Sequence, residues 1–162
     1  QFKTKEALAI SASEKVLTEC EARFATNFST HNTFQIWREW VGNAVRYLFK
    51  SGFDKHKKEQ LCSASSLMND NYMLIIYSGY EDILTKYLAK DFQMNPEHHR
   101  LPRLVAGMLC NGNEAALKRC ANKDGGRDSL ADQDSVISET VAVIDDVACI
   151  FGEHITLKRS AD

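Results

Sequence analysis

Apolar and polar residues follow one another along most of the chain with the spacing of amphipathic helices. Apolar side chains recur at steps of three and four residues, which places them on one face of a helix. The pattern predicts six or seven helices, at residues 5–24, 34–50, 54–68, 71–92, 96–109, 114–121 and 135–151. Residues 72–77 are β-prone, but the helical spacing continues through them, so a helix is expected there too.

The helix predicted at residues 34–50 has the widest apolar surface. At about 100° per residue, its apolar side chains cover about half of the circumference, whereas a helix buried on one side only needs a stripe of about 100°. The central part of this arc contains Phe34, Trp37, Val41, Ala44, Val45 and Leu48, and its shoulder contains Ile36, Trp40 and Tyr47. Such a helix either lies between two layers of its own fold or offers its shoulder to a partner.

The helix predicted at residues 96–109 starts after Asn95, which can cap it, with Pro96 suited to the first helical position. Pro102 is either tolerated early in this helix or marks its real start. Its buried face is expected to contain Leu101, Leu104, Val105, Met108 and Leu109. A break is expected at residues 110–113, before a short helix at residues 114–121. The stretch 101–118 resembles the step from the second to the third helix of armadillo-type repeats, which implies a stacked helical interaction scaffold; no second copy follows at a fixed period.

Length and composition favour one globular domain. The chain has 162 residues, of which 44% are hydrophobic, and it contains two prolines and eight glycines. A domain of this size buries roughly 70% of the surface that its unfolded form exposes, and no apolar run approaches the roughly 20 residues that cross a bilayer. We expect an all-α, single compact domain at residues 1–152, built as a bundle or a short helical stack, with a flexible C-terminal tail at residues 153–162.

The net charge of -2 averages a basic beginning and an acidic end. Residues 1–60 contain ten Lys and Arg against seven Asp and Glu, whereas residues 121–162 contain four against nine. These regions either dock on each other within the fold or form two separate interaction surfaces. The bulk charge gives no case for nucleic acid or for a membrane surface, and no membrane partner is expected.

Five cysteines are scattered through the chain without a CxxC pair. An odd, unpaired set indicates buried free thiols in a reducing compartment, so the cytoplasm is the expected location. The alternative is a secreted helical protein. It rests on Gln1, which could follow a removed signal peptide, and on the glycosylation triplet that begins at Asn27.

Motifs for catalysis, metals and phosphates are missing from the sequence. There is no HExxH and no GxxxxGK, and no acidic residue follows His98 and His99 at ligand spacing. The aspartates between Asp124 and Asp134 do not match a calcium loop, because Gly126 and Ser129 stand where an oxygen ligand and a glycine are needed. No catalytic residue, metal or cofactor is predicted, and an enzyme is the less favoured class.

Three hypotheses of function remain. The first is a non-catalytic protein interaction or self-association domain, a homo-oligomer included, with the partner-binding residues Ile36, Trp40, Arg46 and Tyr47. The second is an RNA or other nucleic-acid-binding helical domain that uses the basic residues Arg38, Arg46, Lys50, Lys57 and Lys58. The third is a small-molecule-binding helical bundle with a cavity lined by Tyr77, Tyr80 and Tyr87.

Overall fold

The computed structural model describes residues 5–50, 71–122 and 129–160, and this part of the chain is all-α, as predicted. It contains five α-helices, fewer than the six or seven expected, and one short 3-10 helix. Their bounds are α1 Lys5–Asn27, α2 Thr33–Lys50, α4 Asn71–Phe92, α5 Leu101–Cys120, α6 Gln133–Phe151 and η2 Gly152–His154. The helix expected at residues 54–68 lies outside the described residues.

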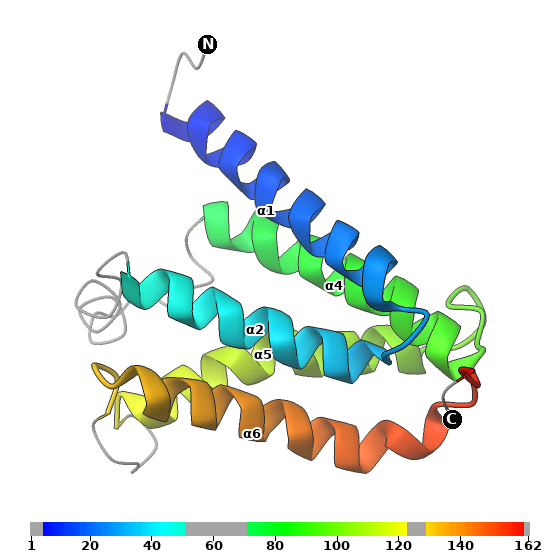
Figure 1. Cartoon of the computed structure of the whole chain (residues 1–162). Helices are drawn as coiled ribbons and strands as arrows, with labels where there is room; N and C mark the ends of the chain where they lie inside the picture. The colour runs from blue at the N-terminus through cyan, green and yellow to red at the C-terminus, as the bar shows by residue number, and fades with distance from the viewer. Residues whose placement is uncertain (1–4, 51–70, 123–128, 161–162) are drawn as a thin grey trace.

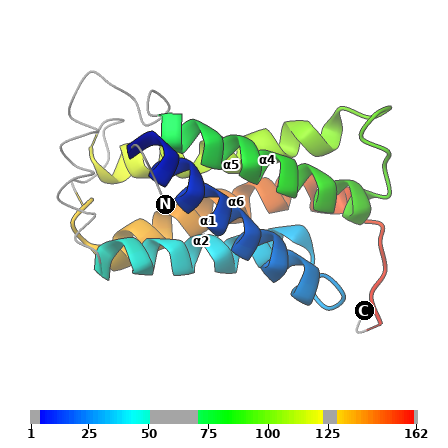
Figure 2. The same ribbon diagram turned by 90° about the horizontal axis from the view of Figure 1, so that it is seen from above.

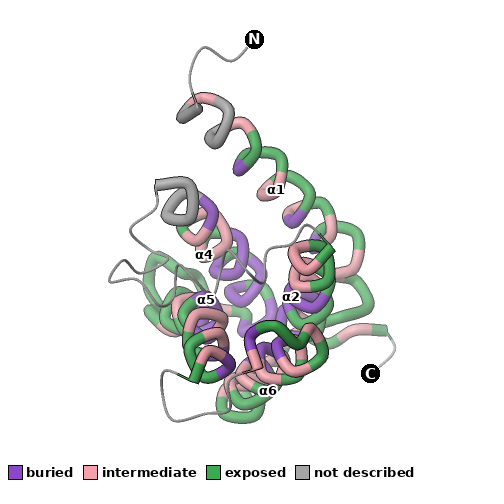
Figure 3. Tube along the Cα trace, turned by 90° about the vertical axis from the view of Figure 1, so that its left-hand side faces the viewer, coloured by how far each residue is buried: buried purple, intermediate pink, exposed green. Residues whose placement is uncertain are grey.

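Four helices form a bundle, and α1 lies across it (Figure 1). Helix α4 packs on α5, α5 on α6, and α6 on α2, while α1 packs mainly on α4. Seen from above, α1 lies over the space between α4 and α2 (Figure 2). The C-terminal part of α1 reaches the bundle, whereas its N-terminal part points away from it (Figures 1 and 3).

The two ends of the bundle therefore differ. We call the closed end the one where the α1–α2 connection, the α4–α5 connection and the segment after η2 come together (Figure 1). The open end is the opposite one, where α1 and α2 diverge (Figure 1).

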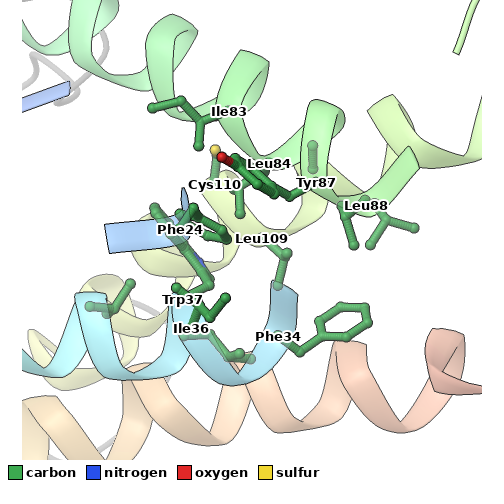
Figure 4. Close-up of a cluster of buried hydrophobic side chains, with 14 of the residues drawn as sticks. Phe24, Phe34, Ile36, Trp37, Ile83, Leu84, Tyr87, Leu88, Leu109 and Cys110 are labelled. Carbon is green, nitrogen blue, oxygen red and sulfur yellow. The ribbon is translucent and has the colours of Figure 1, made fainter. Parts of the chain in front are cut away.

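The core is built where α1, α2, α4 and α5 meet. Phe24 of α1, Trp37 of α2 and Leu84 of α4 are completely buried, and Leu109 of α5 joins them (Figure 4). The ring of Phe24 stacks on that of Tyr87 at a centroid distance of 4.9 Å. Large aromatic side chains contribute the most buried area per residue, so this cluster accounts for much of the stability of the fold.

Helix α5 is continuous where a break was expected at residues 110–113, and this prediction was wrong. Gly112 faces α6 so closely that a Cβ atom added to it would lie 2.6 Å from Cγ1 of Val143. Gly112 is therefore a point where two helices approach closely and not a turn. The close packing that it allows offsets the roughly 1 kcal/mol that glycine costs inside a helix. The resemblance to armadillo-type repeats needs the break, so it does not hold.

Of the two starts that the sequence allows for α5, the later one at Pro102 is correct: the helix begins at Leu101, with Pro102 in its first turn, and not at Pro96. The preceding residues form a turn around Asn95. Its side-chain oxygen accepts a hydrogen bond from the backbone N–H of Glu97 at 2.9 Å, and its carbonyl accepts those of His98 and His99. These bonds use up the cap that the sequence offered to a helix.

A buried ion pair holds the closed end together. Asp91 is completely buried at the end of α4, and its Oδ1 accepts a hydrogen bond from Nη2 of Arg159 at 2.7 Å. Its Oδ2 accepts from the backbone N–H and the hydroxyl of Thr33 at 2.7 and 2.6 Å. The Arg159 Nε–H donates to the carbonyl of Phe28, and its guanidinium lies over the Phe28 ring. The pair of Asp91 and Arg159 thus joins the ends of α1 and α4, the start of α2 and the C-terminal segment.

The C-terminal segment is docked in this structure. The backbone N–H groups of Thr156 and Leu157 both donate to the carbonyl of Asp91, at 2.9 and 3.0 Å. The flexibility expected for residues 153–162 concerns motion and stays a prediction, which amide hydrogen exchange of these two groups can test.

Candidate functional site on helix α2

The three shoulder residues of α2 differ in exposure along the helix. Ile36 is 3% exposed, Trp40 is half-buried, and Tyr47 is 70% exposed. Near the closed end, α1 covers this side of α2, and Nη1 of Arg23 on α1 lies 3.2 Å from Oε1 of Glu39 on α2. Toward the open end α1 has moved away, so the same side of α2 reaches solvent (Figure 3).

Ile36 belongs to the core and is not available to a partner, which corrects its assignment as a partner-binding residue. It packs in the same cluster as Cys20 and Phe24 of α1. Sequence periodicity could not detect this, because it shows which residues share a side of a helix but not where a neighbouring helix leaves that side.

Trp40 is held in one orientation at the border of the exposed region. Its indole Nε1–H donates a hydrogen bond to the hydroxyl oxygen of Tyr80 at 3.2 Å. The Tyr80 ring in turn stands edge-on to Trp37 at 5.1 Å and to Trp40 at 6.4 Å. An indole fixed in this way loses little side-chain entropy when a partner covers it, which is typical of aromatic anchor residues.

Cations flank the exposed aromatic residues. Arg46 and Lys50 are exposed, and Nη1 of Arg46 donates to the side-chain oxygen of Asn43 at 3.2 Å. No acidic residue occurs from Trp40 to Lys50. At 100° per residue, Asn43, Arg46, Tyr47 and Lys50 lie on one side of the helix with Trp40 at its edge. We call these five residues the α2 face.

Of the residues proposed for nucleic acid, only Arg46 and Lys50 are shown close together, one turn apart on α2. Nε of Arg38 lies 3.0 Å from Oδ1 of Asp145 on α6, so its charge is paired within the fold. Lys50 is twelve residues further along α2, or roughly 18 Å at 1.5 Å per residue. Lys57 and Lys58 lie outside the described residues.

The three tyrosines proposed to line a cavity are engaged in packing. Tyr87 stacks on Phe24, and its hydroxyl donates to Oε1 of Glu21 at 3.1 Å. Tyr80 packs between the two tryptophans of α2, and burial raises the pKa of Tyr77 to about 12. Two open hollows of about 460 and 320 Å³ in the described part of the molecule lie elsewhere. The larger is lined by Arg119, Cys120, Ser129, Ser135 and Glu139 among others, and the smaller by Asn111, Glu114, Ala115 and Lys118.

The buried thiols are poor nucleophiles. Burial raises the pKa of Cys20 and of Cys110 to about 12, and it also raises that of Cys120. A thiol acts as a nucleophile through its thiolate, so these groups stay unreactive near neutral pH. Among the described residues, the four cysteines are free and no group of three or more metal-ligating side chains comes together.

Two features of the structure were missed by sequence reasoning. The Asp91 cluster joins residues up to 131 positions apart, and no local motif indicates it. Leu104 and Met108 were expected in the buried face of α5, but they are 58% and 46% exposed. Helical spacing alone could not separate them from the buried Val105 and Leu109, since all four are apolar and near one another on the helix.

The chain matches no family model, no curated protein and no solved structure. None of the helices in the described part of the chain has the length and apolar character needed to cross a membrane.

Proposed function

We propose that this domain is a non-catalytic protein-interaction module whose α2 face binds an acidic amphipathic helix of a partner protein. The observation that carries the proposal is the 70% exposure of Tyr47 next to the half-buried, hydrogen-bonded Trp40. Tyrosine and tryptophan are enriched among the residues that dominate binding energy at protein interfaces, where truncation of one of them costs about 2 kcal/mol or more.

A helix is the shape that suits this face. Near the closed end, helix α1 already covers the same side of α2, and where α1 diverges Tyr47 is 70% exposed (Figures 1 and 3). A partner helix that follows the direction of α1 would cover Tyr47 in the way that α1 covers Ile36. Recognition of an amphipathic helix by an apolar helical surface is a common mode of binding.

Charge favours an acidic partner over a second copy of the chain. Arg46 and Lys50 flank the aromatic residues, and no acid accompanies them on the α2 face. Two copies of this face would bring like charges together, whereas carboxylates beside the apolar residues of a partner would pair with them.

Charge also favours protein over nucleic acid. Arg38 is paired with Asp145, and Asp134 is exposed on the neighbouring α6, where it would repel phosphates. The α2 face itself has only two cations. Each neutralised phosphate contributes a slope of about -0.9 in the logarithm of affinity against that of salt, so a two-cation contact would bind weakly.

The test uses a synthetic amphipathic helix with leucines on one side and flanking glutamates, and a matched peptide with lysines in place of the glutamates. Isothermal titration calorimetry should show binding of the acidic peptide and at least tenfold weaker binding of the basic one. Tyr47→Ala and Trp40→Ala should each weaken binding of the acidic peptide about tenfold, or about 1.4 kcal/mol. Ile150→Ala is the matched control, since it truncates a 63% exposed apolar residue on another helix and should leave binding unchanged.

Equal binding of the two peptides, or an unchanged affinity of Tyr47→Ala, would overturn the proposal. A single-stranded RNA oligonucleotide is the second arm of the experiment. If it binds more tightly than the acidic peptide and the affinity falls steeply with salt, the face belongs to nucleic acid instead.

A further inference from the structure

A second exposed apolar surface lies on the other side of the bundle, on α5 and α6. Leu104 and Met108 of α5 and Ile150 of α6 are 58%, 46% and 63% exposed. We call these three residues the seam patch. Together with Tyr47 they are the large exposed hydrophobic residues of the described part of the chain.

The contacts between α5 and α6 show that the three residues lie at one level. Gly112 meets Val143, and Nε of Arg119 lies 2.6 Å from Oε1 of Glu139, which fixes the antiparallel register. Counted from this contact at 1.5 Å per residue, Ile150 lies roughly 10 Å along the helix axis. On α5, Met108 lies roughly 6 Å and Leu104 roughly 12 Å in the same direction, so Ile150 falls between them.

The three residues also point to the same side of the molecule. Val105 and Leu109, which follow Leu104 and Met108 in the sequence, are at most 1% exposed and form the inner row of α5. Leu104 and Met108 form a second, outer row, next to α6. Ile150 is seven residues after Val143, two turns along the side of α6 that meets α5.

Charges of opposite sign stand on the two helices at the closed end of this patch. Arg100 is exposed just before α5, and Glu153 is exposed just after α6. The next cation of α5, Arg103, is turned toward α4, where its Nη1 lies 3.1 Å from Glu81 and 3.2 Å from Asp82. The α5 side of the patch is thus basic at this end, and the α6 side is acidic.

We propose that the seam patch binds a second copy of this chain through a two-fold axis parallel to α5 and α6. Such an axis places α5 of one copy over α6 of the other and keeps every residue at its level along the helices. Leu104 and Met108 then cover Ile150 of the second copy, and Arg100 faces Glu153 of the second copy. Each of these contacts occurs twice, and both charge pairs are attractive.

The α2 face has no such self-complementarity, because its charges are all positive. The two surfaces are therefore independent: one takes an acidic helix, and the other takes an identical chain. A standard protein interface buries about 800 Å² on each partner, which takes roughly 20–30 residues. The seam patch offers three large apolar residues per copy, so it buries a smaller area. We therefore expect a weak dimer, with a Kd on the order of 10 to 100 µM.

Sedimentation equilibrium over a concentration series tests the proposal on the full chain. The apparent mass should rise from 18.3 kDa toward twice that value with concentration. Ile150→Glu and Met108→Glu should weaken the dimer at least tenfold, while circular dichroism shows an unchanged helix content, because both side chains are exposed. Tyr47→Ala is the matched control and should leave dimerisation unchanged, which separates this proposal from the function proposed for the α2 face.

Exchanging the charges of Arg100 and Glu153 gives a second, independent test of the dimer. Arg100→Glu should weaken the dimer several-fold, and the double variant Arg100→Glu with Glu153→Arg should restore it, because the exchange keeps the attraction and reverses its direction. A monomer throughout the series, a dimer that Ile150→Glu leaves intact, or a double variant no better than the single one would each overturn the proposal.

Discussion

The closed and open ends of the bundle differ in how far they bury helix α2. At the closed end, the first turns of α2 are enclosed: Thr33 and Ile36 are buried, and the carboxylate of Asp91 binds the start of the helix. At the open end, the last turns of α2 keep Tyr47 at the surface. The path of α1 therefore decides which part of the apolar side of α2 is buried in the core and which part stays exposed.

The largest effect is expected from breaking the closed end at Asp91. Asp91→Ala leaves the guanidinium of Arg159, which is 7% exposed, without its carboxylate, and it removes the acceptor of Thr33. The loss of one partner of a buried ion pair costs about 3–5 kcal/mol of unfolding free energy. Urea denaturation measures this loss. A cost below about 1 kcal/mol would mean that the cluster does not hold this end together.

The next largest difference in unfolding free energy is expected between alanine variants of Ile36 and Tyr47, two residues of the same shoulder of α2. Ile36→Ala should lower the free energy of unfolding by about 2–5 kcal/mol, because it leaves a cavity in the core. Tyr47→Ala should change it by less than about 0.5 kcal/mol, since the side chain is 70% exposed. Thermal and urea denaturation of both variants give the comparison. Similar losses in the two would show that the open end is covered in solution.

Alkaline pH should weaken the core between the two ends. The pKa of Cys20 and of Cys110 is raised by burial from 9.0 to about 12, so both thiols stay protonated in the folded chain. A raised pKa in the folded state contributes stability that is present below pH 9 and is lost between pH 9 and about 12, as the unfolded chain ionises first.

The loss is at most about 1.4 kcal/mol per pH unit for each thiol. Urea denaturation at rising pH measures it, and Cys20→Ala should reduce the slope in this window. An unchanged slope in Cys20→Ala would show that this thiol ionises in the folded chain.

The smallest changes in stability are expected from alanine substitutions of two glycines inside helices. A Cβ atom on Gly79 of α4 would overlap the side chain of Leu17 of α1, whereas one on Gly107 of α5 would meet nothing within 4 Å. Gly107→Ala should therefore stabilise the chain by about 0.5–1 kcal/mol through helix propensity. Gly79→Ala should destabilise it by about 1 kcal/mol, because α1 or Leu17 has to move. Thermal denaturation gives both signs, and a stabilising Gly79→Ala would mean that α1 is loosely held here.

Much of the fold could be predicted from the spacing of apolar residues, and the errors have local causes. The bounds of α2 and α4 follow the pattern closely, because long stretches of apolar residues at helical spacing leave few alternatives. Gly112 was interpreted as a break, although in the fold it is the residue that lets α5 approach Val143. A glycine signals a turn or a close contact equally well, and only the neighbouring helix decides between them.

The candidate site was predictable in part. The shoulder of α2 was visible as a wide apolar arc, and Trp40 and Tyr47 do reach the surface to different degrees. The burial of Ile36 and the pairing of Arg38 with Asp145 were not visible, because both depend on residues of other helices. The exposure of Leu104 and Met108 was missed for the same reason.

The sequence by itself determined that this chain is helical and which sides of its helices are apolar, because these properties depend on residues three or four positions apart. The tertiary structure decided which apolar sides became core and which stayed at the surface. That choice depends on where helices cross and diverge, and it is set by long-range contacts such as Asp91 with Arg159 and Gly112 with Val143. Both proposed interaction surfaces lie where this arrangement of helices leaves large apolar side chains exposed.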